Sequence, residues 1–242
     1  MGLNWKIFGK AFGDFRLPEP EDSHAAFLEG MRRVKADLPG LGSVFIPDAR
    51  FFTANFVSPS GLNRVLIPRF VHVSRNRADG SITGIRNFGL AILNADCPIV
   101  GVFDIRMNRL AILHAGFRCL IRENPDEPSI IKVLFGKYGF RAGNVEVFAG
   151  LGIGACCYGA EHYPEVKHQT VQLPLLRAIR GPRKGKISVD LGILIRSQLL
   201  EEGVTEENIV LNRICTACSP DFHSHVREGP TAGRNLSVVW FE

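Results

Sequence analysis

The sequence has no apolar run approaching the roughly 20 residues that a helix needs to cross a membrane. Its N-terminal stretch, MGLNWKIFGKAFGDF, is interrupted by Lys6 and Lys10 and has no small-residue cleavage site, so a signal peptide is not predicted. Myristoylation is not expected either, because Lys6 stands where that motif needs Ser or Thr. These absences predict a cytoplasmic protein without a membrane partner.

Runs of like charge are also missing. The net charge is +5, but the basic residues are scattered, and the densest cluster, at residues 180–186, is short. This pattern is typical of a solvated loop and not of a nucleic-acid groove, so no nucleic-acid partner is expected. A mildly basic balance suits a small anionic ligand such as phosphate.

Cysteine is sparse, with six residues in 242. Without a secretion signal these cysteines are expected to be reduced and not paired in a disulfide framework. Cys156 and Cys157 are neighbours that cannot easily pair with each other, and we interpret them as structural. Cys215 and Cys218 form a CxxC motif without a second such pair, for which packing is the commoner role.

Residues 89–118, GLAILNADCPIVGVFDIRMNRLAILHAGFR, hold the densest pattern in the chain. Short runs of Val, Ile and Leu bounded by Asn, Asp and Gly predict strands at 89–93, 99–103 and 110–113. An antiparallel hairpin of the last two strands would bring Cys97 beside His114 at one edge of a sheet.

Three interpretations of this Cys–His juxtaposition are open. A buried cysteine and a hydrogen-bonded core histidine would be purely structural. The same two side chains could form a nucleophilic pair, or they could be two ligands of a transition metal. The motif alone does not separate these alternatives.

The segments Asn-Ala-Asp96-Cys97-Pro and His114-Ala-Gly-Phe-Arg118 resemble signature motifs of the YfiH family. That family is also named multicopper polyphenol oxidase or laccase domain, purine nucleoside phosphorylase, and peptidoglycan editing factor. Further similar motifs follow in the family's order, in GLGIGACCY at 150–158, in Cys-Thr at 215–216, and in the tail 222–234. The resemblance implies an α+β fold, with mixed β-sheets packed between helices in a single domain at 43–242. Residues 1–42 are predicted to form an irregular arm and a packing helix.

The resemblance also implies a metal site. His72 matches the family's histidine in a Val-His dipeptide, and with Cys97 and His114 it would complete a His-Cys-His set. Three such ligands and one open position are typical of catalytic zinc, and copper is the alternative ion. His223 and His225 form the one His-X-His in the chain and are a weaker second candidate.

Several other residues are predicted to act at the site. Asp96 would support the metal ligand or accept a proton, although a turn residue would also fit there. Arg118 would bind phosphate and serve in catalysis, because a guanidinium can hold phosphate with two hydrogen bonds. Arg227 and Arg234 are further candidates for phosphate or substrate contact, or for ordinary ion pairs, and Tyr158 for a pocket wall.

The activity that the resemblance implies is zinc-dependent phosphorolysis of adenosine or inosine to the base and ribose 1-phosphate, with adenosine deamination as a possible second reaction. The partners would be a purine nucleoside and phosphate, and the protein would be a monomer or a homodimer. A copper-dependent phenol oxidase is one alternative. A weakened metal- or nucleotide-binding homologue is another, because Ala54, Phe70 and Val73 depart from the family's motifs.

Local patterns predict the remaining elements. Asp22 or Ser23 is predicted to cap a helix that ends at Pro39-Gly40. One face of this helix is formed by Phe27, Met31, Val34 and Leu38. Strands are expected within 43–56 and at 145–148, 209–211 and 236–241, and helices at 128–138 and after Asp190.

Overall fold

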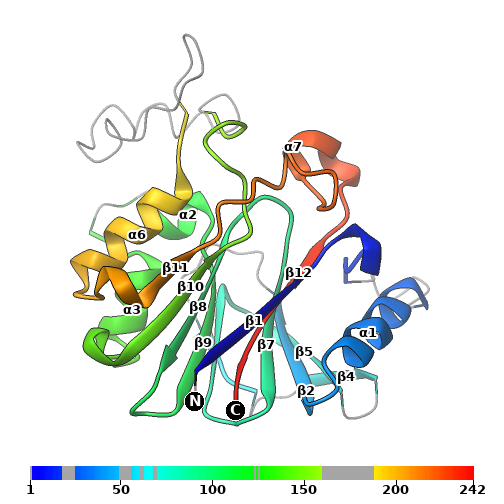
Figure 1. The fold of residues 1–242 in the computed structure, drawn as a ribbon, viewed down its shortest axis with the longest axis horizontal. Coiled ribbons are helices and arrows are strands. Elements are labelled where there is room, and N and C mark those ends of the chain that lie inside the picture. The colour runs from blue at the N-terminus through cyan, green and yellow to red at the C-terminus, as the bar shows by residue number, and fades with distance from the viewer. Residues whose placement is uncertain are drawn as a thin grey trace.

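The computed structural model describes residues 2–17, 25–48, 56–59, 63–67, 70–122, 124, 126–159 and 188–242. Two six-stranded mixed sheets form its centre (Figure 1). The first sheet has the order β1 (Leu3–Phe8), β12 (Asn235–Phe241), β7 (Phe88–Asn94), β2 (Ser43–Asp48), β5 (Val71–Arg77), β4 (Asn63–Ile67). The second has the order β11 (Ile209–Leu211), β10 (Val145–Gly150), β8 (Ile99–Asp104), β9 (Arg109–His114), β6 (Gly80–Thr83), β3 (Phe56–Val57).

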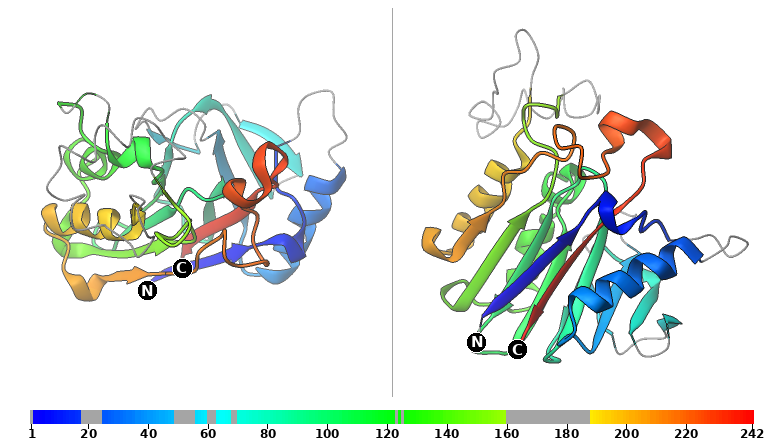
Figure 2. Two further views of the ribbon diagram at one scale, coloured as in Figure 1. Left: turned by 90° about the horizontal axis from the view of Figure 1, so that it is seen from above. Right: turned by 45° about the vertical axis from the view of Figure 1, so that its right-hand side comes forward.

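Helices cover the outer faces of both sheets, as Figure 2 shows. The α-helices are α1 (Ala25–Asp37), α2 (Phe117–Leu120), α3 (Ile130–Gly136), α6 (Leu191–Glu201) and α7 (His225–Glu228). The short 3-10 helices are η1 (Lys10–Phe12), η2 (Ala142–Asn144), η4 (Glu206–Asn208) and η5 (Gly229–Thr231). No helix in these described ranges combines the length and the apolar character that spanning a bilayer requires.

Alternation along the strands gives each sheet two apolar faces, and these build three core layers. Phe45 and Leu90 of one sheet meet Phe103 and Ile112 of the other between the two sheets. The outer face of the first sheet packs on α1, and the outer face of the second packs on α2, α3 and α6. The predicted α+β fold, with mixed sheets between helices, is confirmed.

Most of the predicted elements are present. The helix with Phe27, Met31 and Val34 on its buried face is α1, although its predicted cap at Asp22 or Ser23 lies outside the described residues. Asp190 caps α6 by accepting a hydrogen bond from the Ile193 N–H at 3.0 Å.

The prediction of an irregular N-terminal arm is wrong for Leu3–Phe8. These residues form β1, which pairs antiparallel with all but the first residue of β12 and brings the two termini together (Figure 1). The strand is a half-buried edge strand with Lys6 in its middle, so its local pattern is weak and pairing with β12 stabilises it.

Candidate functional site

The β8–β9 hairpin brings Cys97 and His114 together, as the sequence predicts. Ile99 pairs with His114, and the Ala115 N–H donates to the Pro98 carbonyl at 2.8 Å. Gly116 lies against both side chains, because a Cβ atom there would be 3.0 Å from Cys97 Sγ and 3.4 Å from His114 Nε2. A thiol and an imidazole nitrogen therefore share one small space at the sheet edge.

A buried carboxylate holds the other side of the imidazole. Asp79, which is 0% exposed, places Oδ1 3.1 Å from His114 Nδ1, and its carbonyl accepts the His114 N–H at 2.7 Å. This contact favours a proton on Nδ1, and Nε2 lies on the side of the ring where Gly116 and Cys97 are. Sequence reasoning missed Asp79, because an Asp-Gly dipeptide before a strand is typical of a turn.

The environment of His114 is strongly polar for a buried residue. Burial by itself lowers the pKa of His114, but the charge of the neighbouring Cys97 and the hydrogen bond with Asp79 outweigh it, and the pKa is raised well above its usual value. The Cys119 sulfur lies 3.9 Å from Nδ1, and burial raises the pKa of that thiol. Asp79 and Cys119 thus close the Nδ1 side, and Cys97 defines the Nε2 side.

Asp96 fixes the turn that carries Cys97. It has a φ of 89°, and its carboxylate accepts hydrogen bonds from Thr216 Oγ1 at 2.5 Å and from the Val226 N–H at 2.7 Å. Its carbonyl accepts the Ile153 N–H at 2.7 Å. Because each carboxylate oxygen already has a protein donor, this geometry favours positioning of Cys97 over proton transfer.

His72 lies elsewhere. His72 is in β5 and pairs with Phe45 of the neighbouring strand β2. On its other side Phe45 pairs with Leu90 of β7, so His72 and Leu90 lie at the same level of the sheet. The end of β7 is four residues beyond Leu90, about 13 Å along the strand, and Cys97 follows that end. The His72 ring is instead 6.1 Å from the ring of Phe88, at the start of β7. The structure therefore does not bring His72 to Cys97 and His114, and its role as a ligand stays a prediction.

The remaining predicted contact residues near the hairpin differ in their exposure. Arg118 is the second residue of α2, four residues after His114. It is half-buried, and its carbonyl accepts a hydrogen bond from Arg122. Tyr158 is only 4% exposed and packs into the core beneath α6. Little of the Tyr158 ring is left for a ligand, whereas Arg118 remains a candidate.

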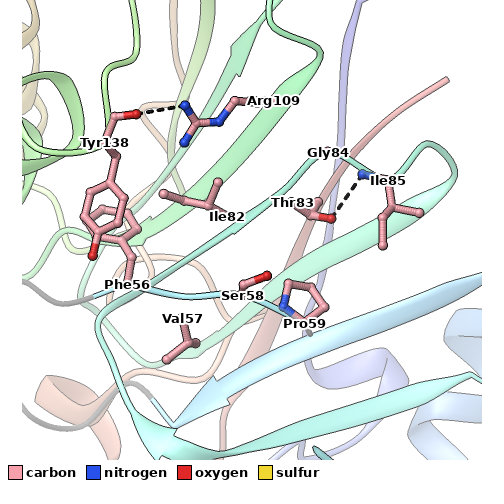
Figure 3. A pocket seen from close by; sticks show the side chains of 10 residues that line it. All are labelled: Phe56, Val57, Ser58, Pro59, Ile82, Thr83, Gly84, Ile85, Arg109 and Tyr138. Atoms are coloured by element: carbon pink, nitrogen blue, oxygen red, sulfur yellow. Dashed lines mark hydrogen bonds between the residues drawn. The ribbon is translucent and has the colours of Figure 1, made fainter. Parts of the chain in front are cut away.

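A separate cavity lies at the opposite end of β9. It has a volume of about 390 Å³, and its lining includes Phe56, Tyr138 and Arg109 (Figure 3). Arg109 begins β9 and His114 ends it, so about 17 Å of strand separates the cavity from the Cys–His pair. This cavity is therefore not the site that the sequence predicts.

Comparison with known proteins assigns the family. The model of a family described as multi-copper polyphenol oxidoreductase laccase matches residues 59–242. The chain belongs to this family. The predicted membership of the YfiH group is thereby confirmed. Solved structures share the fold. YfiH of Bacillus licheniformis superposes with a TM-score of 0.69 at 20% identity, over 92% of this chain and 83% of that one. YlmD of Geobacillus stearothermophilus gives 0.68 at 20% identity, over 99% and 90%. At these identities the likeness shows the fold alone.

Curated relatives carry a functional name. Purine nucleoside phosphorylase YlmD of Bacillus subtilis is 25% identical over 172 residues, which are 71% of this chain and 61% of that protein. Purine nucleoside phosphorylase Rv2149c of Mycobacterium tuberculosis is 29% identical over 210 residues, covering 83% and 76%. A purine nucleoside phosphorylase of Corynebacterium glutamicum is 31% identical over 163 residues, covering 67% and 62%.

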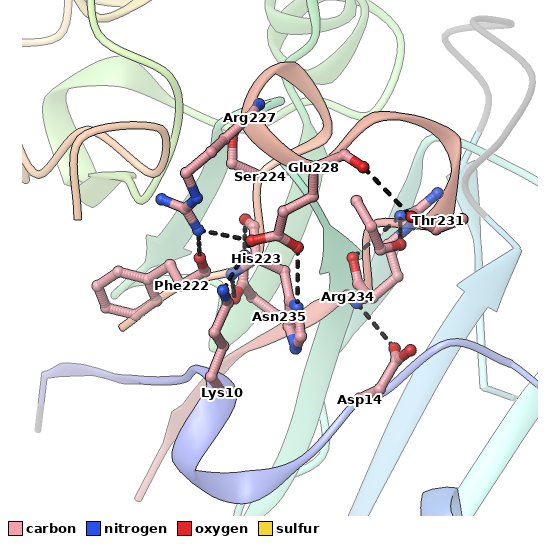
Figure 4. A network of polar contacts seen from close by, with 12 residues as sticks. Lys10, Asp14, Phe222, His223, Ser224, Arg227, Glu228, Thr231, Arg234 and Asn235 are labelled. Atoms are coloured by element: carbon pink, nitrogen blue, oxygen red, sulfur yellow. Dashed lines mark hydrogen bonds and ion pairs between the residues drawn. The ribbon is translucent and has the colours of Figure 1, made fainter. Parts of the chain in front are cut away.

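The tail at residues 222–234, which we call the C-terminal clasp, makes many contacts within the protein (Figure 4). The Arg227 guanidinium donates to four backbone carbonyls of the preceding loop and to the Glu228 carboxylate. The carbonyls belong to Thr216, Ala217, Ser219 and Phe222. Arg234 likewise donates to the Ala232 and Gly233 carbonyls at 2.7 and 3.0 Å. These contacts favour the ion-pair and packing alternative over substrate binding, most clearly for Arg227.

Replacing Arg227 with alanine should lower the free energy of unfolding by about 2 kcal/mol, because several hydrogen bonds from a charged donor are lost together. Lysine should restore little, since an ammonium cannot reproduce the planar fork of donors. Chemical denaturation measures both variants. A higher KM for phosphate with unchanged stability would contradict this expectation and return Arg227 to the substrate site.

His223 is engaged on both ring nitrogens. Nδ1 lies 3.4 Å from Glu228 Oε2, and Nε2 lies 3.2 Å from the Gly13 carbonyl. Ser224, between the two histidines, caps α7. These contacts tie the tail to the N-terminal segment and occupy both ring nitrogens of His223, so they favour a structural role for His223 over metal binding.

The stability that this clasp contributes depends on pH through Glu228. Burial by itself raises the pKa of Glu228, but hydrogen bonds from Lys10, Arg227 and His223 outweigh it and lower the pKa to about 2. Because the folded pKa lies below the unfolded one of about 4.3, the stabilisation is complete above the unfolded value. It is lost as the pH falls through the folded value.

Glu228→Gln should therefore lower stability at neutral pH and weaken the loss of stability between about pH 4.3 and 2. Unfolding midpoints measured across that range test this. Glu29→Gln is the matched control, since Glu29 forms exposed pairs on α1. Parallel pH curves for wild type and Glu228→Gln would contradict a role for Glu228.

Proposed function

We propose that this protein is a zinc-dependent purine nucleoside phosphorylase. The observation that carries the proposal is the group of Asp79, His114 and Cys97, in which a buried carboxylate orients an imidazole whose other nitrogen lies near a thiol. The curated relatives named purine nucleoside phosphorylase support the substrate class. The predicted cleavage would join phosphate to C1′ of the ribose while the C1′–N9 bond to the purine breaks.

The donor chemistry of the pair suits zinc. Imidazole nitrogen and thiolate sulfur both bind zinc well, and a carboxylate on Nδ1 is the usual support of a metal-bound histidine. Cys97 and His114 would hold the ion, and a bound zinc would supply a Lewis acid at its open position. The sequence predicts His72 as a third donor, but His72 lies along the sheet from this pair, so the proposal rests on Cys97 and His114.

Three further residues near the pair are proposed to bind phosphate or to position the two ligands. Arg118, the second residue of α2, is proposed to hold phosphate with two hydrogen bonds. Asp79 would keep the proton on His114 Nδ1, so that Nε2 stays available on the Cys97 side. Asp96 would hold the Cys97 turn through Thr216 and the Val226 N–H.

The direct test is turnover of inosine and adenosine with and without phosphate. Phosphate-dependent appearance of the free base and ribose 1-phosphate is expected. Conversion of adenosine to inosine without phosphate would add the deaminase reaction. Oxidation of a phenol that requires copper, without phosphorolysis, would overturn the proposal in favour of the alternative that the family's description suggests.

A multi-copper centre has little support in the residues that the structure describes. Within these ranges, His114 is the one histidine that lies close to two other possible ligand residues, Asp79 and Cys119. Several coppers would require several histidines grouped in this way.

A second candidate is a metal-binding homologue without turnover. The placement of His72 along the sheet from Cys97 favours it, because a site with two donors binds metal less well than one with three. Bound zinc with no loss of inosine or adenosine would assign this role.

A further inference from the structure

Four cysteines from two distant segments converge in the structure. Cys156 and Cys157 follow β10, and Cys215 and Cys218 follow β11. Their sulfur atoms all lie within 4.8 Å of one another. We propose that Cys156, Cys157, Cys215 and Cys218 bind a zinc ion as a closed, structural site. The proposal does not depend on the proposed function, because none of the four residues belongs to the Cys97–His114 pair.

The sheet brings the two segments together. β10 and β11 are parallel neighbours (Figure 1). Beyond their ends Gly152 forms a further parallel bridge with Cys215. The Thr216 N–H donates to the Gly152 carbonyl at 3.0 Å. Turns then direct the sulfurs inward, as the N–H of Cys157 donates to Gly154 at 2.9 Å and that of Ser219 to Cys215 at 3.0 Å.

The separations between the sulfurs match a metal better than a disulfide. Cys218 Sγ lies 3.5 Å from Cys156 Sγ and 3.4 Å from Cys157 Sγ. Four sulfurs at about 2.3 Å from a tetrahedral zinc are about 3.8 Å apart. A disulfide bond is only about 2.05 Å long, and all four thiols are free in the structure. The cluster therefore needs only small shifts to enclose an ion.

Packing does not explain the cluster. Cys156 and Cys218 are exposed, whereas cysteines that serve as small apolar side chains are usually buried. In addition, the Gly154 N–H donates to Cys215 Sγ at 3.2 Å, a contact that stabilises a thiolate ligand. Gly154 also leaves room, because a Cβ there would lie 3.3 Å from Cys156 Sγ.

Zinc is the ion that this set fits best. Four sulfur donors in a tetrahedral arrangement bind zinc or iron, and zinc needs no redox partner. With four protein ligands no position is open, so the ion would be structural. Its effect would reach the Cys–His pair, because Thr216, next to Cys215, donates to Asp96 beside Cys97.

The test is zinc content by elemental analysis on the full-length protein purified without chelator. Wild type should hold about two zinc ions per chain, one for each proposed site, and Cys218→Ser and Cys156→Ser about one. These variants change exposed sulfurs and leave the buried Cys215 in place. Ser219→Ala is the matched control in the same loop and should keep the wild-type content.

Cobalt gives a second measurement. Co²⁺ added to zinc-depleted protein should give the visible spectrum of tetrahedral cobalt with several thiolates, and Cys218→Ser should lose most of its sulfur-to-cobalt band. Full zinc content in both Cys218→Ser and Cys156→Ser would overturn the proposal. A Cys157–Cys218 disulfide found by mass spectrometry in freshly purified protein would also overturn the proposal. Iron found in place of zinc would overturn the choice of ion.

The Cys97→Ser variant separates this proposal from the proposed function. The four-cysteine site predicts that Cys97→Ser keeps about one zinc per chain while it loses turnover. If zinc is present in wild type but absent from Cys97→Ser, the four-cysteine site is overturned and the other site stands. If wild type holds one zinc, which Cys218→Ser loses and Cys97→Ser keeps, the four-cysteine site stands and zinc binding by the Cys97–His114 pair is overturned.

Discussion

Replacing His114 with alanine should reduce phosphate-dependent inosine turnover by about 1000-fold. A metal acting as a Lewis acid supplies several kcal/mol of transition-state stabilisation, and each 1.36 kcal/mol corresponds to about a factor of ten in rate. His114 provides one of the two donors that the structure brings together. Steady-state kinetics and zinc content, measured on the same preparation, test the expectation.

Asp79→Asn is the companion variant. It preserves shape but removes the negative charge at 3.1 Å from His114 Nδ1, and loss of such a partner typically lowers metal affinity or activity by about 10- to 100-fold. A graded series is therefore expected, with His114→Ala more severe than Asp79→Asn. Full activity in His114→Ala would contradict the proposed role of His114 as a metal ligand.

His72→Ala tests the third donor. If His72 completes the site, as the sequence predicts, this variant should lose zinc and turnover as Cys97→Ser does. In the structure the His72 ring is near Phe88, along the sheet from the pair. Retention of zinc and turnover in His72→Ala would exclude His72 as a ligand and leave Cys97 and His114 as the assigned donors.

Asp96→Ala should lower the free energy of unfolding by about 3–4 kcal/mol. The change removes an acceptor of two hydrogen bonds and leaves the Thr216 hydroxyl and the Val226 N–H without their partner. Alanine also tolerates a φ of 89° less well than Asp does. For a chain of this length the melting temperature should fall by about 10 °C, as calorimetry can measure.

Two variants define what Asp96 contributes. Thr216→Val removes one of the hydrogen bonds and should cost about 1–2 kcal/mol. Asp96→Asn keeps an acceptor and the tolerance for positive φ, so it should be milder than alanine and retain most zinc. Wild-type stability in Asp96→Ala together with lost turnover would contradict positioning and support the predicted proton transfer.

The site illustrates how far local patterns reach. The apolar runs around Asp104 predict the β8–β9 hairpin, and the hairpin geometry places Cys97 beside His114 without further information. Asp79 reaches the same histidine only because β6 pairs with β9 in the sheet. A single Asp-Gly dipeptide does not reveal that pairing, because sheet order depends on contacts between distant residues.

The cysteines show the same limit. Each pair is visible in the sequence, but a lone CxxC and a Cys-Cys dipeptide have no evident relation. The parallel pairing of β10 and β11 makes them neighbours. Arg227 also shows this limit. Its sequence motif suggested a contact with a ligand, whereas in the structure its guanidinium donates to backbone carbonyls of the preceding loop.

The sequence by itself determined the elements with strong local periodicity, including α1, α6 and the strands around Cys97, because helix and strand faces repeat at fixed spacing. Its motifs also determined the family and the Cys97–His114 pair. Only the tertiary structure decided that β1 joins the sheet, that Asp79 and Asp96 support the pair, and that four cysteines meet. These contacts join segments far apart in the chain, and their partners follow from sheet order and burial, which local spacing does not encode.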